Sequence, residues 1–294
     1  MTRSLYDLVL KWVLISIGVI ILLTLVSLFD RRSASRAWSF SKGPRIGLVE
    51  ITGLILDSGP VVRRIDELSR RKDIDAILVR IESPGGAVAA SQEIYMKLAK
   101  VRDEGHKPLV ASMGNVAASG GVYVAMGVDT IMANPGTATG SIGVILDYVV
   151  AEDLLKKLGL SIEVVKSGPL KDAGAPYRAA TEQDRAIFQG LIDDLYDQFI
   201  ETVAMERGLA LADVRKMATG EIFTGRQAQK LGLIDLLGSY DDAVNLAGLM
   251  TGSDERPEVV RPVRRRRRTL LDWILGDLTS QILYPQLMPQ YRLR

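Results

Sequence analysis

The sequence has no cysteine and a single histidine, His106, among its 294 residues. The missing cysteines exclude cysteine peptidases, disulfide frameworks, iron–sulfur sites and cysteine-ligated zinc. One histidine also excludes a metal site that takes two histidines from the same chain. His106 lies in a polar stretch that ends at Pro108, which is typical of a solvated loop. Any nucleophile in this protein is therefore predicted to be activated by a group other than histidine.

An excess of one charge is also missing, because the formal net charge is only +2. No broad basic face with interleaved aromatics is present, so nucleic-acid binding is not expected. The apolar share of 47% allows a substantial core. The five arginines Arg264–Arg268 precede apolar residues at helical spacing. This pattern fits either a surface helix on anionic lipid or a basic linker with a small docking helix.

The longest uncharged apolar run is Trp12–Phe29, close to the roughly 20 residues that cross a bilayer. No small-residue cleavage site ends the run, so an uncleaved signal anchor is predicted, with a cleaved signal peptide as the alternative. Positive charges flank the run on both sides and slightly favour a cytoplasmic location for its C-terminal side. The flanking residues are Arg3, Lys11, Arg31, Arg32 and Arg36.

Short apolar runs alternate with helical periodicity after residue 44, which indicates an α/β fold with parallel crossover units. The predicted strands are Arg45–Ile51, Ile74–Ile81, Leu109–Met113, Thr130–Ala133, Ile142–Leu146 and Ser161–Val165. The predicted helices are Val61–Arg71, Val88–Arg102 and Ala151–Leu158. A long helix is predicted to begin at Thr181, where Asp184 gives a near capping box. Its apolar stripe is Ile187, Leu191, Leu195, Phe199 and Val203.

Three glycine-rich junctions stand out as candidate sites. The first, Glu82–Val88, joins a buried strand to a helix, and its adjacent glycines would let a backbone N–H face an oxyanion. The second, Gly114–Tyr123, surrounds Ser119 with small residues that leave room for a substrate carbonyl. Taken alone, this second junction is more typical of a helix-capping serine.

The third junction is Thr139–Val144, followed by a turn at Lys166–Gly174 that contains Lys171. A lysine acts as a general base only when desolvation lowers its pKa from about 10.4 towards neutrality. A loop lysine is ordinarily solvated. The combination of Lys171 with Ser119, and the absence of another plausible base, favours a role in catalysis.

These three junctions, in this order, resemble the signal peptide peptidase A (SppA) family of bacterial serine peptidases, in its short form. Ile222–Ala228 and Leu231–Asp235 extend the resemblance, which covers about Arg45–Ala247. It implies a ClpP/crotonase-like α/β fold of stacked ββα units, with Ser119 as nucleophile and Lys171 as general base. It also implies that Ser141 orients the lysine and that Gly86 and Gly120 form the oxyanion hole. Val122 departs from the family, in which an aromatic residue is frequent at that position.

The resemblance further implies peptide substrates such as remnant signal peptides, a homo-oligomeric ring that shares its sites between protomers, and no cofactor or metal. It places the catalytic domain outside the bacterial cytoplasmic membrane, in contact with membrane lipid. The expected organisation is a signal anchor at 1–32, a linker at 33–44, a peptidase domain at 45–250 and a basic, amphipathic segment at 251–294. Three alternatives stay open. They are a SohB-like or membrane-protein quality-control peptidase, a crotonase-type acyl-CoA enzyme and a non-catalytic membrane scaffold.

Overall fold

The structure is a computed structural model, and it describes residues 43–261 and 290–292. The predicted membrane span at residues 12–29 and most of the predicted C-terminal segment lie outside these residues. Within the described part, no helix is both long and apolar enough to cross a bilayer.

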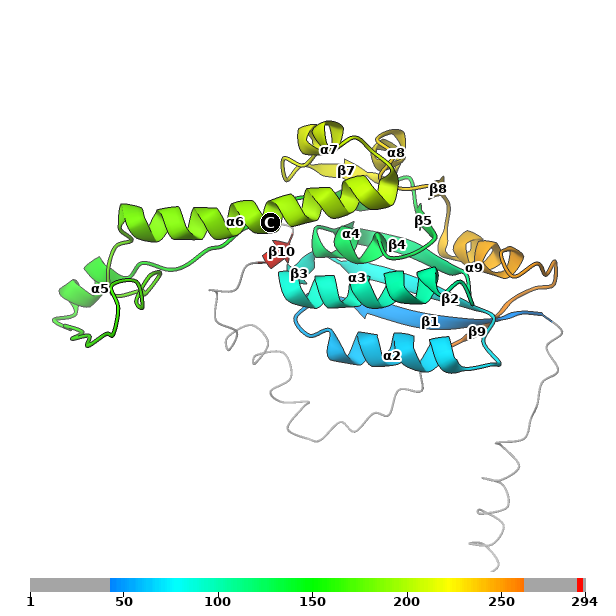
Figure 1. Cartoon of the computed structure of the whole chain (residues 1–294), viewed down its shortest axis with the longest axis horizontal. Coiled ribbons are helices and arrows are strands. Elements are labelled where there is room, and N and C mark those ends of the chain that lie inside the picture. Colours follow the sequence, from blue (N-terminus) through cyan, green and yellow to red (C-terminus); the bar gives the residue numbers. More distant parts are fainter. Residues whose placement is uncertain (1–42, 262–289, 293–294) are drawn as a thin grey trace, which may run out of the picture. The chain divides into compact units, whose positions relative to one another are not determined.

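A largely parallel sheet forms the centre of the fold (Figure 1). Its main path runs β7-β6-β4-β2-β1-β9, and β5 and β8 extend it beside β4. The antiparallel pairing of β6 with β7 is the exception to its parallel pairings. The strands are β1 (Arg45–Thr52), β2 (Ala76–Ser83), β4 (Leu109–Ala118), β5 (Thr130–Ala133), β6 (Ala138–Gly140), β7 (Ile222–Thr224), β8 (Leu236–Leu237) and β9 (Glu258–Val260). A separate antiparallel pair joins β3 (Gly85–Ala87) to β10 (Gln290–Arg292).

Helices cover both faces of the sheet. Side chains alternate between the faces, so Leu48 of β1 packs in the core cluster of α9 and Val49 in that of α2 and α3. Because the strands are buried on both faces, they read as nearly continuous apolar runs. The helices are α2 (Gly59–Arg70), α3 (Val88–Asp103), α4 (Gly120–Ala125), α5 (Glu152–Lys157), α6 (Glu182–Arg207), α7 (Leu211–Met217), α8 (Gly225–Lys230) and α9 (Tyr240–Leu249). The predicted α/β class with a parallel sheet is confirmed.

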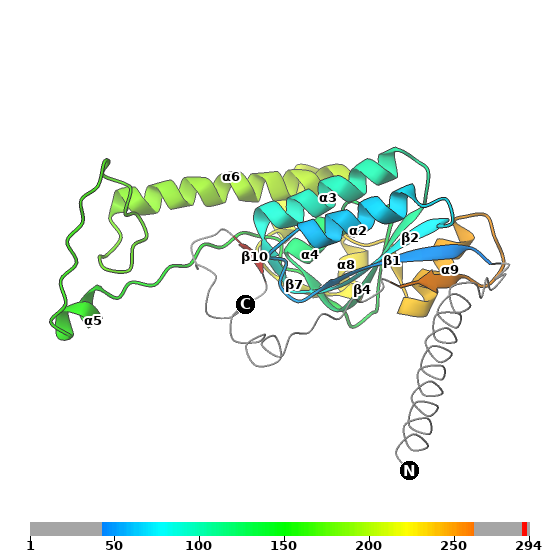
Figure 2. The ribbon, with the colours of Figure 1, turned by 90° about the horizontal axis from the view of Figure 1, so that it is seen from below.

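The long helix α6 is only partly packed on this core. It begins with the predicted capping box, in which the Thr181 side chain accepts from the Asp184 N–H. Its C-terminal half buries Phe199 and Val203, whereas Ile187 and Leu191 on the same stripe are 44% and 41% exposed. Figures 1 and 2 show the N-terminal half of α6 reaching beyond the sheet, with α5 and its flanking segments at the far end. We call residues 145–191 the arm.

Two of the predicted strands are wrong. Neither Ile142–Leu146 nor Ser161–Val165 belongs to a described strand, although the other predicted strands and helices are present. The second segment is exposed, and Val165 is fully so. Apolar, β-branched residues favour a strand only where a neighbouring strand can pair with them. Among the described residues, the first segment makes only a single β-bridge, at Ile145, and the second makes no pairing.

Candidate active site

Ser119 lies at the junction between β4 and α4, with φ 53° and ψ −114°. This conformation is rare for a residue that carries a side chain. The residue is fully buried, and its Oγ has no hydrogen-bond partner among the described residues. It occupies the N-cap position of α4, as the capping interpretation predicted, but its side chain makes no capping hydrogen bond there. Backbone strain and a buried unpaired hydroxyl each cost on the order of 1–3 kcal/mol, and strain of this kind clusters at functional sites.

Ser141 stands at the end of the strand next to that of Ser119. β4 and β6 run parallel, and Ala118 pairs with Gly140, the residues directly before the two serines. Neighbouring strands lie about 4.8 Å apart, so the two serine backbones are close. The Ser119 N–H donates to the Gly140 oxygen at 2.8 Å, and the Ser141 N–H donates to the Glu221 oxygen at 2.7 Å. Ser141 also has a positive φ, 51°, and is buried.

Gly86, at the centre of β3, has no room for a side chain. A Cβ there would come within 2.1 Å of the Ile55 oxygen. The Ile55 N–H donates to the Gly85 oxygen at 2.9 Å, and the Ile55 oxygen accepts from the Ala87 N–H at 2.7 Å. Alternate residues of a strand turn their N–H groups to opposite edges, so that of Gly86 faces away from Ile55. β10 pairs along this other edge, with Tyr291 opposite Gly86.

The first turn of α4 lies against the same glycine turn. β3 contacts α4, and a Cβ on Gly121 would lie 3.2 Å from the Ser83 oxygen. The Gly120 N–H belongs to this first turn, whose N–H groups have no acceptor within the helix. The structure thus gathers Ser119, Gly120, Ser141 and the β3 glycines at the carboxyl ends of the adjacent strands β2, β4 and β6. Open α/β sheets bind their ligands at this end.

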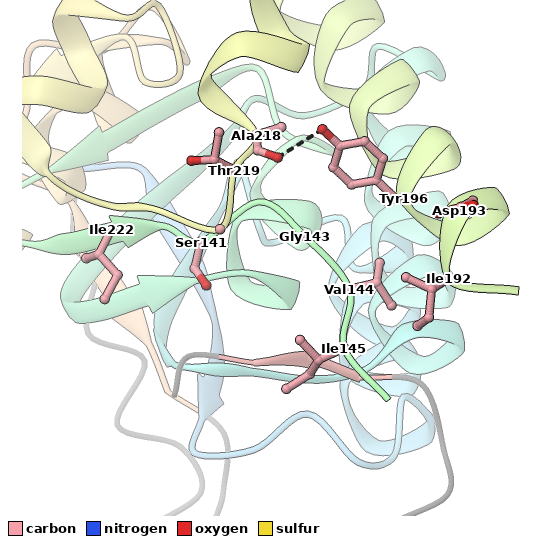
Figure 3. Close-up of a pocket in the computed structure, with 11 residues that line it drawn as sticks. Ser141, Gly143, Val144, Ile145, Ile192, Asp193, Tyr196, Ala218, Thr219 and Ile222 are labelled. Atoms are coloured by element: carbon pink, nitrogen blue, oxygen red, sulfur yellow. Dashed lines mark hydrogen bonds between the residues drawn. The ribbon is translucent and has the colours of Figure 1, made fainter. Parts of the chain in front are cut away.

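A cavity of about 390 Å³ opens beside Ser141, as Figure 3 shows. It lies between α6 and the loops that follow β6 and precede β7. Tyr196 of α6 forms part of its wall and donates its hydroxyl to the Ala218 oxygen at 2.9 Å. Its apolar lining residues are Val144, Ile145, Ile192, Ala218 and Ile222. An apolar pocket with a few polar groups suits an apolar side chain of a ligand.

Lys171 lies on another part of the fold. It is exposed, in a turn between α5 and α6, and its N–H donates to the Gly168 oxygen at 3.3 Å. Figures 1 and 2 both place the segment between α5 and α6 at the far end of α6, away from α4 and β3. Within one chain, the structure therefore brings together four of the five predicted site residues and leaves the predicted base apart.

The sequence did not reveal an ion-pair cluster beside Lys171. Arg178 joins Asp172, the next residue along the chain, to Asp184 in the first turn of α6. The capping-box pattern points to Asp184, but it cannot show that the same carboxylate also binds Arg178. In the part of the chain that the structure describes, no group of three His, Asp or Glu side chains is arranged to hold a metal ion.

Comparison with known proteins identifies the family of the chain. The model of peptidase family S49 matches residues 101–252, which is half of the chain. The chain belongs to peptidase family S49. The matched region contains Ser119, Gly120, Ser141 and Lys171, whereas Gly86 precedes it.

Several curated proteins similar to this chain are named as proteases or peptidases, in agreement with family S49. A putative protease of Synechocystis sp. is 47% identical over 220 residues, which are 74% of this chain and 79% of that protein. A putative protease of Methanocaldococcus jannaschii is 33% identical, over 78% of this chain and 74% of its own length. A putative signal peptide peptidase SppA of Enterococcus faecium is 32% identical, over 68% and 62% respectively. The prediction of an SppA-family serine peptidase is confirmed, and the acyl-CoA enzyme loses its support.

Proposed function

We propose that this S49 peptidase is a membrane-bound serine endopeptidase that hydrolyses apolar, membrane-derived peptides, remnant signal peptides among them. Ser119 is the nucleophile and Lys171 the general base. The Ser119 side chain carries this proposal, because it is buried, lacks a partner among the described residues and sits on strained backbone. A hydroxyl that makes no structural hydrogen bond is free to give its proton to an approaching base.

The reaction follows from these roles. Neutral Lys171 takes the Oγ proton as Ser119 attacks the peptide carbonyl carbon, while the N–H groups of Gly86 and Gly120 stabilise the oxyanion and the Ser141 hydroxyl orients the amine. As the C–N bond breaks, Lys171 gives its proton to the leaving amine, and an acyl-enzyme ester remains on Ser119. Water then gives a proton to Lys171 and attacks the ester, which releases the carboxylic acid and restores the serine hydroxyl.

A second copy of the chain supplies the lysine. Most of the exposed large apolar side chains lie on the arm, which also carries Lys171. They are Val149, Val150, Leu154, Leu158, Leu160, Ile162, Val164, Val165, Ile187 and Leu191. An exposed apolar surface of this kind marks a protein or membrane contact. If each arm lies against the next copy in a head-to-tail contact, repetition of the contact closes a homo-oligomeric ring.

Two features support an extended, apolar peptide as substrate. β3 already pairs through the Gly86 edge with a short antiparallel strand, β10, so this edge accepts an extended chain. Strand addition of this kind binds peptides through backbone hydrogen bonds and selects them through side-chain pockets. The apolar cavity beside Ser141 is such a pocket. The name of the Enterococcus relative, a putative signal peptide peptidase, points to the same substrate class.

We place the enzyme at the bacterial cytoplasmic membrane, with residues 12–29 as a single span in contact with lipid and the catalytic domain on the outer side. The 18 uncharged residues of this run support the anchor. Long domains translocate despite positive charges next to a span. The same proposal assigns the fold to the stacked ββα units of Clp protease and crotonase, for which the parallel sheet and the separate β3 pair are the support.

The dyad is tested in the full-length protein with Ser119→Ala, Lys171→Ala and a control, Lys157→Ala, which changes another exposed lysine of the arm. We expect the first two variants to lose cleavage of a fluorogenic apolar peptide and the control to keep the wild-type rate. An acylating phosphonate should label Ser119 in the wild type, as mass spectrometry would show. Full activity of Lys171→Ala would overturn the proposal.

Co-expression of the Ser119→Ala and Lys171→Ala chains tests whether copies share sites. In a randomly mixed ring with head-to-tail contacts, about one quarter of the sites would combine an intact serine with an intact lysine. We therefore expect activity to return to roughly that fraction, although each variant alone is inactive. No recovery in mixed assemblies would show that both residues act within one chain.

A further inference from the structure

A cluster of two carboxylates and two cations lies directly beside the turn that carries Lys171. Arg178 donates from Nη2 to Asp172 Oδ1 at 2.8 Å and from Nη1 to Asp184 Oδ2 at 2.5 Å. Its Nη2 also reaches Asp184 Oδ1 at 3.2 Å. Lys166 Nζ donates to the same Asp172 oxygen at 2.8 Å. Arg178 therefore bonds to both carboxylates at once.

The carboxylates of this cluster are buried although the arm is largely exposed. The side chains of Asp184 and Asp172 are 1% and 8% exposed, and that of Arg178 is 24% exposed. Hydrogen bonds from Arg178 lower the pKa of Asp184 to about 2. Hydrogen bonds from Arg178 and Lys166 also hold the pKa of Asp172 well below its usual range. Both carboxylates thus stay ionised at neutral pH and keep the guanidinium in place.

One end of the cluster is fixed to a long helix. Asp184 belongs to the capping box of α6, where its Oδ2 accepts from the Thr181 N–H at 2.9 Å and its own N–H donates to Thr181 Oγ1 at 3.1 Å. α6 has 26 residues, and its other half is buried in the core through Phe199 and Val203. Arg178 therefore links the lysine turn to an element whose position the core determines.

Other interactions fix the turn less well. The Lys171 N–H donates to the Gly168 oxygen at 3.3 Å and the Ala173 N–H to the Leu170 oxygen at 3.1 Å, so these bonds stay within the turn. The Ala151 N–H donates to the Pro176 oxygen at 2.6 Å, which ties the chain to the start of α5 but not to α6. No large apolar side chain of the described arm is fully buried around the turn, where Leu170 and Tyr177 are half-buried.

We propose that Arg178 is the positioning residue for the base: it fixes the Lys171 turn to the N-terminus of α6, so that the amine reaches a neighbouring copy's serine in a defined place. This inference rests on the proposed function, since it takes Lys171 as the base. Catalytic groups have to be held within about 0.5 Å of their productive geometry. Arginine suits this role because its planar fork bonds two carboxylates together, whereas a lysine ammonium is a flexible point charge.

The test uses Arg178→Lys in the full-length protein, which keeps the charge and loses the fork. We expect kcat to fall between about tenfold and a hundredfold, as for a small misplacement of a catalytic group, with KM unchanged. Asp172→Asn removes the negative charge that holds Arg178 from the side of the turn and should lower kcat without changing KM, even if Arg178→Lys does not assemble.

Arg207→Lys is the matched control. Arg207 forms a similar half-buried pair at the other end of α6, where its Nη2 lies 2.6 Å from Asp235 Oδ1. It does not touch the lysine turn, so this variant should lower the thermal midpoint without changing kcat. An equal loss of kcat in Arg178→Lys and Arg207→Lys, or a wild-type kcat in both Arg178→Lys and Asp172→Asn, would overturn the positioning role.

Lys171→Met, assayed alongside, separates this inference from the proposed function. If Lys171→Met is inactive while Arg178→Lys and Asp172→Asn cleave at the wild-type rate, only the positioning role fails. If Lys171→Met keeps its activity, the dyad itself fails and the inference fails with it.

Discussion

At the scale of single residues, Ser119 and Ser141 share an unusual arrangement. Both come directly after a paired position on neighbouring parallel strands, both have positive φ, and both are buried. A single strained serine can result from the geometry of one turn. Two such residues side by side at the carboxyl ends of the strands indicate a functional site, because their strain does not contribute to stability.

Substitutions of Ser119 should therefore separate activity from stability. Ser119→Ala removes the unpaired hydroxyl and keeps the strain, so the free energy of unfolding should rise by up to about 1 kcal/mol. Ser119→Gly also relieves the positive φ, worth about 1–3 kcal/mol, less the roughly 0.5–1 kcal/mol that glycine loses in chain entropy. Both variants should be inactive. Denaturant unfolding, alongside a peptide cleavage assay, measures both effects.

Ser112→Ala is the control for this comparison. Ser112 is also buried in β4, but its hydroxyl accepts a hydrogen bond from Arg80 Nη1 at 3.0 Å. Its removal leaves a charged donor unsatisfied and should lower the free energy of unfolding by about 1–3 kcal/mol. If Ser119→Ala were destabilised as much as Ser112→Ala, the hydroxyl of Ser119 would have a structural partner after all.

The sequence could indicate Ser119 as a candidate nucleophile but not its backbone conformation. Small flanking residues and the order of the three junctions are visible in the chain. The positive φ depends on the pairing of β4 with β6 and on the bond from Ser119 to Gly140, which neighbouring residues alone do not determine. Lys171 was predicted through its motif, and its separation from Ser119 results from the arm, whose direction no local pattern encodes.

At the scale of elements, hydrogen bonds from α3 hold the C-terminal end of α6. Near its C-terminus, Glu206 accepts from the Tyr95 hydroxyl at 2.5 Å and from Arg102 Nη1 at 2.6 Å, both on α3. Burial and the bond to Glu206 raise the pKa of Tyr95 well above its usual value, so the hydroxyl remains a donor. Tyr95 also packs edge-on against Tyr123 of α4.

Glu206→Ala should loosen this end of α6. The Glu206 side chain is 10% exposed and that of Arg102 is 21% exposed, so the variant leaves a half-buried guanidinium without its main partner. We expect the free energy of unfolding to fall by about 2–4 kcal/mol. Asp213→Ala removes an exposed pair with Lys216 on α7 and should change it by less than about 0.5 kcal/mol. Equal losses in the two variants would contradict the anchoring role of Glu206.

Element prediction succeeded where the pattern was local and failed where the partner was missing. The capping box and apolar stripe located α6, and continuous apolar runs located β1, β2, β4 and β5. Ile142–Leu146 and Ser161–Val165 have the composition of strands, but among the described residues the first makes only a single β-bridge, at Ile145, and the second makes no pairing. The second of them instead belongs to the exposed apolar surface of the arm, which is consistent with the proposed contact to a neighbouring copy.

At the scale of the whole molecule, the predicted site residues lie in two regions that differ in burial. The serine, the glycines and the cavity lie on a core buried on both faces of the sheet. The lysine lies on the arm, where many apolar side chains are exposed in the single chain. A monomer organised in this way has the parts of an active site without their contact, so activity should depend on association.

Charged substitutions on the arm test this dependence. Val165 is fully exposed and Leu160 is 57% exposed, so Val165→Asp and Leu160→Asp should hardly change the stability of the isolated chain. Each places a charge in the proposed contact between the arm and a neighbouring copy, which should reduce the assembly mass in light scattering and the cleavage rate together. Higher protein concentration should restore part of both by mass action.

Leu249→Asp, at a 57% exposed position on α9, is the control and should change neither the assembly mass nor the cleavage rate. A Val165→Asp protein that is monomeric and still cleaves at the wild-type rate would show that one chain completes the site alone.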